Sequence, residues 1–195
     1  VLDFPGRIAP PAPRIVEQVT NLLASGTRTV REYCLLCLTA LAQSAKEGMV
    51  TIYPTLLPFL RTLAEDPMPA FAAAARGKLL PASLDPRRVR GLACDALSNL
   101  AAAVGPSVCA ADLPAILATL GKAAAEATGP DDSLRACAWE ALALMAQEFP
   151  DGASSVIPVL VPALMHAGGQ TLDAREVSQE EAQAYRERLD AEAAE

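Results

Sequence analysis

The sequence repeats one pattern of residues three times, and this repetition constrains the fold more than any other feature. Each copy has an apolar residue followed by arginine, a small residue three positions later, and large apolar residues four and seven positions after that. The copies begin at Val30, Val89 and Leu134. A second pattern follows each copy, with its proline 24 or 25 residues after the start of the first. Its copies are Tyr53-Pro54-x-x-Leu57-x-x-Leu60, Leu113-Pro114-x-x-Leu117-x-x-Leu120 and Ile157-Pro158-x-x-Val161-x-x-Leu164.

The distance between copies predicts a stack of helix pairs. Val89 and Leu134 are 45 residues apart, within the period of roughly 40–47 residues that is typical of HEAT and armadillo arrays. Val30 and Val89 are 59 residues apart, so we place an insertion at residues 65–85. The expected fold is an all-α superhelix, a HEAT-repeat solenoid of about three full repeats preceded by a half repeat.

Composition agrees with a helical chain. Hydrophobic residues make up 52% of the sequence and aromatic residues only 4%, so the core must be built from alanine, leucine and valine. Apolar residues recur at the i, i+3/i+4, i+7 spacing of helices, and no long window alternates as a half-buried strand would. We therefore expect almost no β-structure.

The repeats divide the chain into five parts. These are residues 1–26, the second helix of a truncated repeat; 27–85, a repeat with the 65–85 insertion; 86–129 and 130–168, two further repeats; and 169–195, an acidic helical tail. The sequence opens on half a repeat and without an initiator methionine. We therefore expect it to be a fragment of a longer protein.

Capping and turn residues predict the helix boundaries. First helices are expected at 29–46, 86–104 and 132–149, and second helices at 12–25, 50–65, 107–128 and 154–166. Pro54, Pro114 and Pro158 are tolerable in a first turn, where a backbone N–H has no partner in any case. Pro58 and Pro162 lie four residues further on and should bend or break their helices.

The charge balance limits the class of partner. The formal net charge is −7 with a pI near 4.8, which disfavours nonspecific nucleic-acid binding and favours basic partners. Much of the acidity lies in residues 173–195, which hold eight acids and three arginines. We expect this tail to form a short helix with a solvated face.

No group of residues indicates catalysis. The five cysteines lie in or beside apolar helical stretches, as reduced thiols of an intracellular protein do. Cys34 and Cys37 have the spacing of a zinc half-site but lack a second ligand pair, and Cys34 shares its register with Ala93 and Ala138. His166 is expected at a helix C-terminus. We predict no enzymatic activity, cofactor, metal, membrane span or signal peptide.

The repeated arginines have two interpretations. Arg31, Arg90 and Arg135 could form a basic ladder for an acidic partner, or could bond between adjacent repeats to groups such as Asp95 and Glu140. We favour the structural ladder. Likewise we expect Trp139 to be buried at a repeat interface in preference to binding a ligand.

Residues 30–66 and 88–165, about two-thirds of the chain, resemble the importin-β (karyopherin-β) superfamily, closest to its importin-5 (karyopherin-β3) branch. The resemblance is carried by Val30-Arg31-Glu32, Tyr53-Pro54-x-Leu56-x-Pro58-x-Leu60, Arg90-Gly91, Ala138-Trp139, Gln147-Glu148-Phe149 and Val159-x-x-Pro162-x-Leu164-Met165. The 65–85 insertion is unmatched.

The resemblance implies a nuclear transport receptor that shuttles between cytoplasm and nucleus. In that family, second helices line a concave surface for cargo with basic nuclear localisation signals, first helices can meet phenylalanine-glycine nucleoporins, and Ran GTPase contacts lie mainly in repeats absent here. The acids available for a basic signal are Glu65, Asp112 and Glu126. The alternatives are a HEAT scaffold or regulatory subunit of a protein complex, and a HEAT-type enzyme, which would need metal-binding His/Glu pairs or a catalytic base that we do not find.

Overall fold

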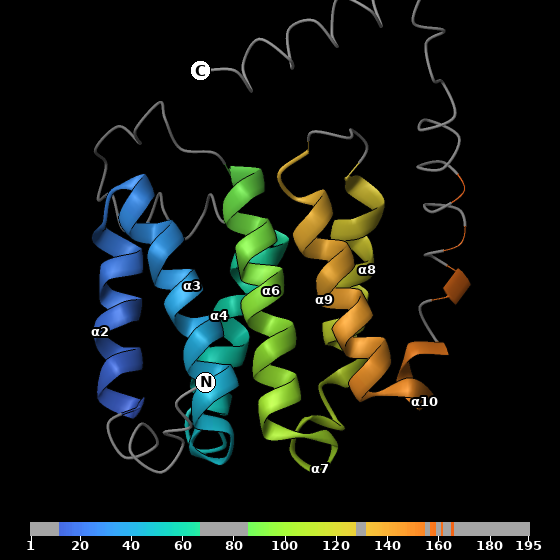
Figure 1. Ribbon diagram of the computed structural model, residues 1–195, viewed down its shortest axis with the longest axis horizontal. Coiled ribbons are helices and arrows are strands. Elements are labelled where there is room, and N and C mark those ends of the chain that lie inside the picture. Colours follow the sequence, from blue (N-terminus) through green and yellow to red (C-terminus); the bar gives the residue numbers. More distant parts are fainter. Residues whose placement is uncertain are drawn as a thin grey trace, which may run out of the picture.

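A computed structural model describes residues 12–66, 86–127 and 132–154, together with positions 157, 158, 161 and 165 of a further helical stretch (Figure 1). The described residues form helices and contain no strand, which confirms the all-α prediction. The elements are α2 (Ala12–Ser25), α3 (Arg28–Ala45), η1 (Lys46–Met49), α4 (Tyr53–Glu65), α6 (Pro86–Val104), α7 (Pro106–Cys109), α8 (Leu113–Glu126), α9 (Arg135–Glu148) and α10 (Pro150–Ala153).

Several boundaries agree closely with the sequence. Helices α2 and α6 begin and end at the predicted residues, and α3 is shifted by a single residue. The predicted helix 107–128 is instead two helices, α7 and α8, separated by a turn. Pro114 explains the division, because it has no N–H to donate to the carbonyl four residues earlier and is favoured where a helix starts. Pro54 also lies in a first turn, as predicted.

Pro58 does not break its helix, one of the two outcomes predicted for it. Helix α4 continues through Pro58 to Glu65 without a break. The Pro58 side chain is exposed, so its ring meets solvent, and the helix loses the single N–H bond that this position would donate to the Pro54 carbonyl. Pro162, His166, most of the insertion and the acidic tail lie outside the described residues.

The helices pack in two layers. Helices α3, α6 and α9 lie side by side in sequence order, and α4 and α8 lie behind them (Figure 1). Helix α4 packs against α6 and α8, α8 packs against α9, and α2 packs against α3 at one end of the array. The expected first helices thus share one layer, with α4 and α8 forming the second.

Helix α6 is the centre of the hydrophobic core. It packs against α3, α4, α8 and α9, and most of its residues are buried. Gly91 lets α9 approach, because a Cβ atom there would lie 3.0 Å from the Ser133 carbonyl oxygen and 3.2 Å from Cys137 Cβ. The register of small residues places Cys34 and Ala93 in the core as predicted, and Ala138 joins them there.

Polar bonds fix the register of α3 against α6. The Thr39 hydroxyl donates to Asp95 Oδ2 at 3.2 Å, and Gln43 Nε2 donates to Asn99 Oδ1 at 3.0 Å. Arg88 pairs with Glu32 at 3.4 Å near the other end. Each pair is separated by 56 residues, as expected for two parallel helices that run side by side.

Candidate functional site

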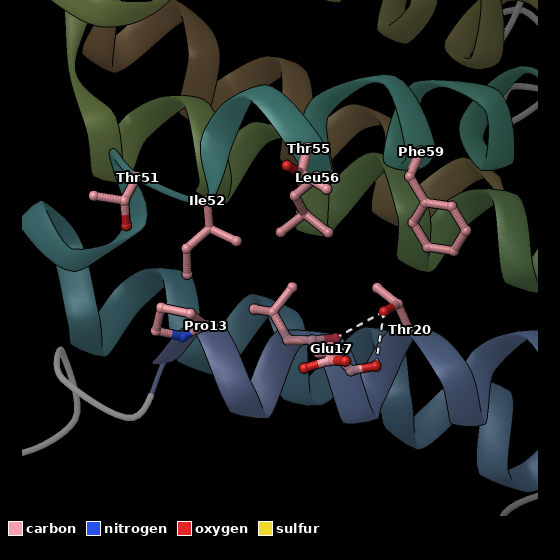
Figure 2. Close-up of a pocket in the computed structure, with 9 residues that line it drawn as sticks. Pro13, Glu17, Thr20, Thr51, Ile52, Thr55, Leu56 and Phe59 are labelled. Carbon is pink, nitrogen blue, oxygen red and sulfur yellow. Dashed lines mark hydrogen bonds between the residues drawn. The ribbon is translucent and has the colours of Figure 1, made fainter.

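A groove of about 550 Å³ separates α2 from α4 (Figure 2). Its wall on the α4 side is formed by Ile52, Leu56 and Phe59, with Thr51 and Thr55 beside them. Ile52 and Leu56 are buried and Phe59 is half-buried. These side chains project from one face of α4 and the turn before it toward α2 (Figure 2). This wall therefore offers an apolar surface with hydroxyl groups at its edge.

The opposite wall comes from α2. Pro13 and Val16 supply its apolar part, and Glu17 and Thr20 supply its polar part. The Thr20 hydroxyl bonds to the carbonyl oxygens of Val16 at 2.9 Å and Glu17 at 3.0 Å, so its proton is used within the helix. Glu17 is exposed, is the only charged residue lining the groove, and has no ion-pair partner among the described residues. The groove is thus apolar with one carboxylate at its side.

The repeat register explains why α4 and α8 meet directly. Sixty residues separate Pro54 from Pro114, so Ile52 and Phe59 correspond to Asp112 and Thr119 in the next unit. Tyr53 donates its hydroxyl proton to Asp112 Oδ2 at 3.0 Å, and Thr119 donates to Glu65 Oε1 at 3.1 Å. Two polar bonds therefore tie α4 to α8 at these register positions.

The same register explains why a groove remains between α2 and α4. At the positions of Asp112 and Thr119 this unit has Ile52 and Phe59, which cannot accept or donate a side-chain hydrogen bond. The position of Tyr53 is held in α2 by Ala12, whose methyl group is too short to bridge two helices. Counterparts of the two α4–α8 hydrogen bonds therefore cannot form between these residues of α2 and α4.

The three acids predicted to bind a partner form bonds within the chain. Besides its bond to Thr119, Glu65 pairs with Arg61 at 3.5 Å. Asp112 accepts from Tyr53, and Glu126 pairs with Arg90 at 2.8 Å and Lys122 at 3.9 Å. Each of these acids therefore bonds to a side chain from another helix, as part of the packing between helices.

Two of the three ladder arginines, Arg31 and Arg90, bond to the preceding unit, but through backbone carbonyls. Arg31 Nε donates to the Leu23 carbonyl at 3.1 Å, and Arg90 Nε donates to the Ala64 carbonyl at 3.0 Å. Each arginine thus reaches the last turn of the second helix that precedes it, where carbonyl groups lack partners within the helix. The Arg135 side chain makes no hydrogen bond or ion pair with another described residue.

The acidic partners named for this ladder, Asp95 and Glu140, are wrong. Asp95 accepts from Thr39 and Asn99, and neither Asp95 nor Glu140 bonds to an arginine in the described part of the chain. Asp95 lies in the first-helix layer, whereas the arginines turn toward the second helices. Burial, and then the nearby charge of Glu140, raise the pKa of Asp95.

The cysteines occupy packing positions. Cys34 is buried and Cys37 is exposed on α3. Burial raises the pKa of Cys34, Cys109 and Cys137, and raises that of Cys94 to about 12. Thiolates, not thiols, act as nucleophiles and metal ligands, so these four thiols are poorly suited to either role.

The described residues hold no group of three or more His, Cys, Asp or Glu side chains placed to bind a metal ion. None of their helices combines the length and the apolar character needed to cross a membrane. Trp139 is half-buried and packs against the hydrophobic core.

Comparison of the chain with protein-family models, with curated proteins and with solved structures gave no match. The groove residues were not among the predicted site residues, because an apolar residue at helical spacing ordinarily indicates core. The signal that could have revealed them is a difference between repeats: Ile52 and Phe59 stand where the next unit has Asp112 and Thr119.

Proposed function

We propose that this chain is a protein-binding scaffold organised as a HEAT-repeat solenoid, and more specifically a cargo-binding segment of a nuclear transport receptor of the importin-β type. The observation that carries the proposal is the open groove between α2 and α4. Stacked helix pairs leave continuous surfaces between neighbouring helices, and proteins of this architecture use them for binding.

The solenoid part of the proposal is supported by bonds that recur from unit to unit. Arg31 and Arg90 hold equivalent positions in the repeated pattern, and each donates to a carbonyl near the end of the preceding second helix. Pro54 and Pro114 both open a second helix. Residues at equivalent positions therefore make equivalent contacts in successive units, as expected for a repeat architecture.

Binding is also the function that fits the side chains. The described residues of the groove present apolar surface, three threonine hydroxyl groups and one carboxylate, which suit recognition of a side chain more than transfer of a proton or a group. We propose that the protein acts without covalent chemistry and without a cofactor.

The transport-receptor form of the proposal rests on the sequence resemblance and on one feature of the first-helix layer. Tyr33 and Leu36 lie on the outer side of α3, where they are 67% and 42% exposed. Aromatic and aliphatic side chains in such a position suit the phenylalanine side chains of nucleoporin repeats. Ran GTPase would be bound by repeats outside this chain, and the receptor would shuttle between cytoplasm and nucleus.

A general HEAT scaffold, holding the subunits of a protein complex, is the second candidate. It is favoured by the internal bonds of Glu65, Asp112 and Glu126, because acids engaged in packing are less available to a lysine-rich signal. A scaffold needs grooves but no acidic surface.

Pull-down assays separate the two forms. The protein is incubated with immobilised phenylalanine-glycine repeats and with lysine-rich signal peptides, against control repeats with serine in place of phenylalanine and control peptides with glutamate in place of lysine. Selective retention by either ligand supports a transport receptor. Failure with both ligands would overturn the transport-receptor proposal. The general scaffold proposal would then depend on whether the groove binds a partner.

A further inference from the structure

We infer that the α2–α4 groove binds a peptide segment that carries one large apolar side chain next to a lysine or arginine. The inference rests on the proposed protein-binding function and names the chemistry of the partner. Its basis is the juxtaposition of an apolar surface with the exposed carboxylate of Glu17, which forms no ion pair with another described residue (Figure 2).

The size of the groove suits a short segment. Its volume of about 550 Å³ lies within the roughly 300–1,000 Å³ typical of sites that enclose small ligands. It can admit a leucine or phenylalanine side chain with part of its backbone, but not a folded domain. Val16 on one wall and Leu56 and Phe59 on the other would then cover that side chain from both sides.

The groove occurs where neighbouring second helices would otherwise meet. Ile52, Leu56 and Phe59 occupy the register that Asp112, Ile116 and Thr119 occupy in α8, and α8 packs against α4. Helix α4 thus presents the equivalent face to α2 across a gap. An apolar side chain inserted there would supply the contact that the neighbouring helix supplies in the next unit.

The charge of Glu17 determines which residue we expect beside the apolar side chain of the bound peptide. Among the described residues that line the groove, Glu17 alone carries a charge, and its side chain is exposed beside apolar side chains. A lysine or arginine adjacent to the apolar anchor would pair with it, whereas an acidic neighbour would be repelled. A single carboxylate calls for one basic residue and not for a run of lysines.

The same charges argue against a second copy of this chain as the occupant. The chain has a net charge of −7, and a symmetric dimer through this groove would bring two Glu17 carboxylates to one interface. Like charges opposed across an interface disfavour association. A basic and apolar peptide from another protein has the complementary charge.

Synthetic peptides test the inference on the full chain. The probe is a short peptide with a central leucine followed by lysine; one matched peptide has alanine in place of leucine, and another has glutamate in place of lysine. Fluorescence anisotropy gives the dissociation constants. We expect the alanine peptide to bind about 10–100-fold more weakly, from the transfer free energy of a buried leucine. We expect the glutamate peptide to bind at least about fivefold more weakly.

Variants of the protein locate the binding site. Glu17→Gln should weaken the leucine-lysine peptide about two- to fivefold and leave the glutamate peptide no weaker. Glu148→Gln, a matched change of an exposed glutamate on α9, should change neither. Thr55→Trp should fill the groove and abolish binding, whereas Thr62→Trp, on the same helix outside the groove, should not. Circular dichroism of each variant verifies that it is folded.

Several results would overturn the inference. They are equal affinity for the leucine and alanine peptides, unchanged affinity in Thr55→Trp, no binding of any peptide at millimolar concentration, and a dimer in sedimentation experiments that Thr55→Trp dissociates. The last result would assign the groove to a second copy. Retention by immobilised repeats or signal peptides without binding in the groove would leave the proposed function standing and remove only this site.

Discussion

Helix α4 packs closely against α8 but is separated from α2 by a groove. Against α8 it packs directly, with one hydrogen bond from Tyr53 to Asp112 and another from Thr119 to Glu65. Toward α2 it leaves a groove of about 550 Å³. The residues of α4 that line the groove and the residues of α8 that contact α4 hold matching positions in the repeated pattern. The pattern alone therefore does not determine whether neighbouring helices pack together. The polar residues at a few of its positions do.

Arg90 adds a third tie to the closed pair. From α6 it donates to the Ala64 carbonyl of α4 and pairs with Glu126 of α8. One side chain thus joins the C-terminal ends of both helices. The α4–α8 interface is thus stabilised by the Tyr53 hydroxyl at the start of α4, by the Thr119 hydroxyl within α8, and by the Arg90 guanidinium at the ends of both helices.

The largest contrast should come from deleting register-matched apolar side chains. Ile116 is fully buried and Leu56 is 2% exposed, but Leu56 also lines the groove. Truncation to alanine in a core costs about 2–5 kcal/mol, with more for a cavity that cannot relax. We expect Ile116→Ala to lose about 4 kcal/mol and Leu56→Ala about 2 kcal/mol in urea unfolding. Equal losses would show that the groove face is as tightly packed as the closed one.

The second contrast concerns the arginines. Arg90→Met should lose about 1–2 kcal/mol of unfolding free energy, because it removes a charge-assisted bond to Ala64 and a partly exposed pair with Glu126. Arg135→Met is the control, since the Arg135 side chain has no such partner among the described residues, and should change stability by less than about 0.5 kcal/mol. A loss in Arg135→Met as large as in Arg90→Met would contradict the assignment of the ladder.

The third contrast is pH-dependent. Burial, and then the bond to Asp112, raise the pKa of Tyr53 above its ordinary value of 10.0. The folded state therefore favours the neutral phenol, and the stability this provides is present below about pH 10 and is lost as the pH rises above it. Tyr53→Phe should lose about 1 kcal/mol at neutral pH and should lose less than the native chain between pH 10 and 12.

Tyr33→Phe provides the control for that experiment, because Tyr33 is 67% exposed. It should follow the native chain at every pH. If Tyr53→Phe also follows the native chain above pH 10, the Tyr53 hydroxyl does not contribute to the closed interface.

These contrasts show what the sequence could and could not predict. The bounds of α2 and α6 follow from local signals, namely apolar spacing and residues that start or stop helices. The hydrogen-bond partners of the Arg31 and Arg90 guanidinium groups could not be predicted from such local signals. Asp95 and Glu140 share one register with each other and are examples of the acidic partners expected from the sequence, but the two arginines bond instead to carbonyls near helix ends.

The groove was harder to predict, for a different reason. Apolar periodicity states which face of a helix is buried, not whether the neighbour that buries it is a helix of the same chain. Ile52 and Phe59 read as ordinary core residues until they are set against Asp112 and Thr119 in the next unit. Likewise Glu65 reads as a free surface acid, and only the fold shows that Thr119 donates to it.

The smallest effect should come from closing the groove with an apolar side chain. Thr55 is exposed and lines the groove on α4, beside Leu56. Thr55→Leu should bury added methyl groups against α2 and stabilise the chain by about 0.5–1 kcal/mol. Thr62→Leu, on the same helix but outside the groove, is the matched control and should change stability by less than about 0.5 kcal/mol. If both variants respond alike, the gain reflects helix propensity alone; a gain confined to Thr55→Leu means that an apolar side chain can occupy the space that separates α2 from α4.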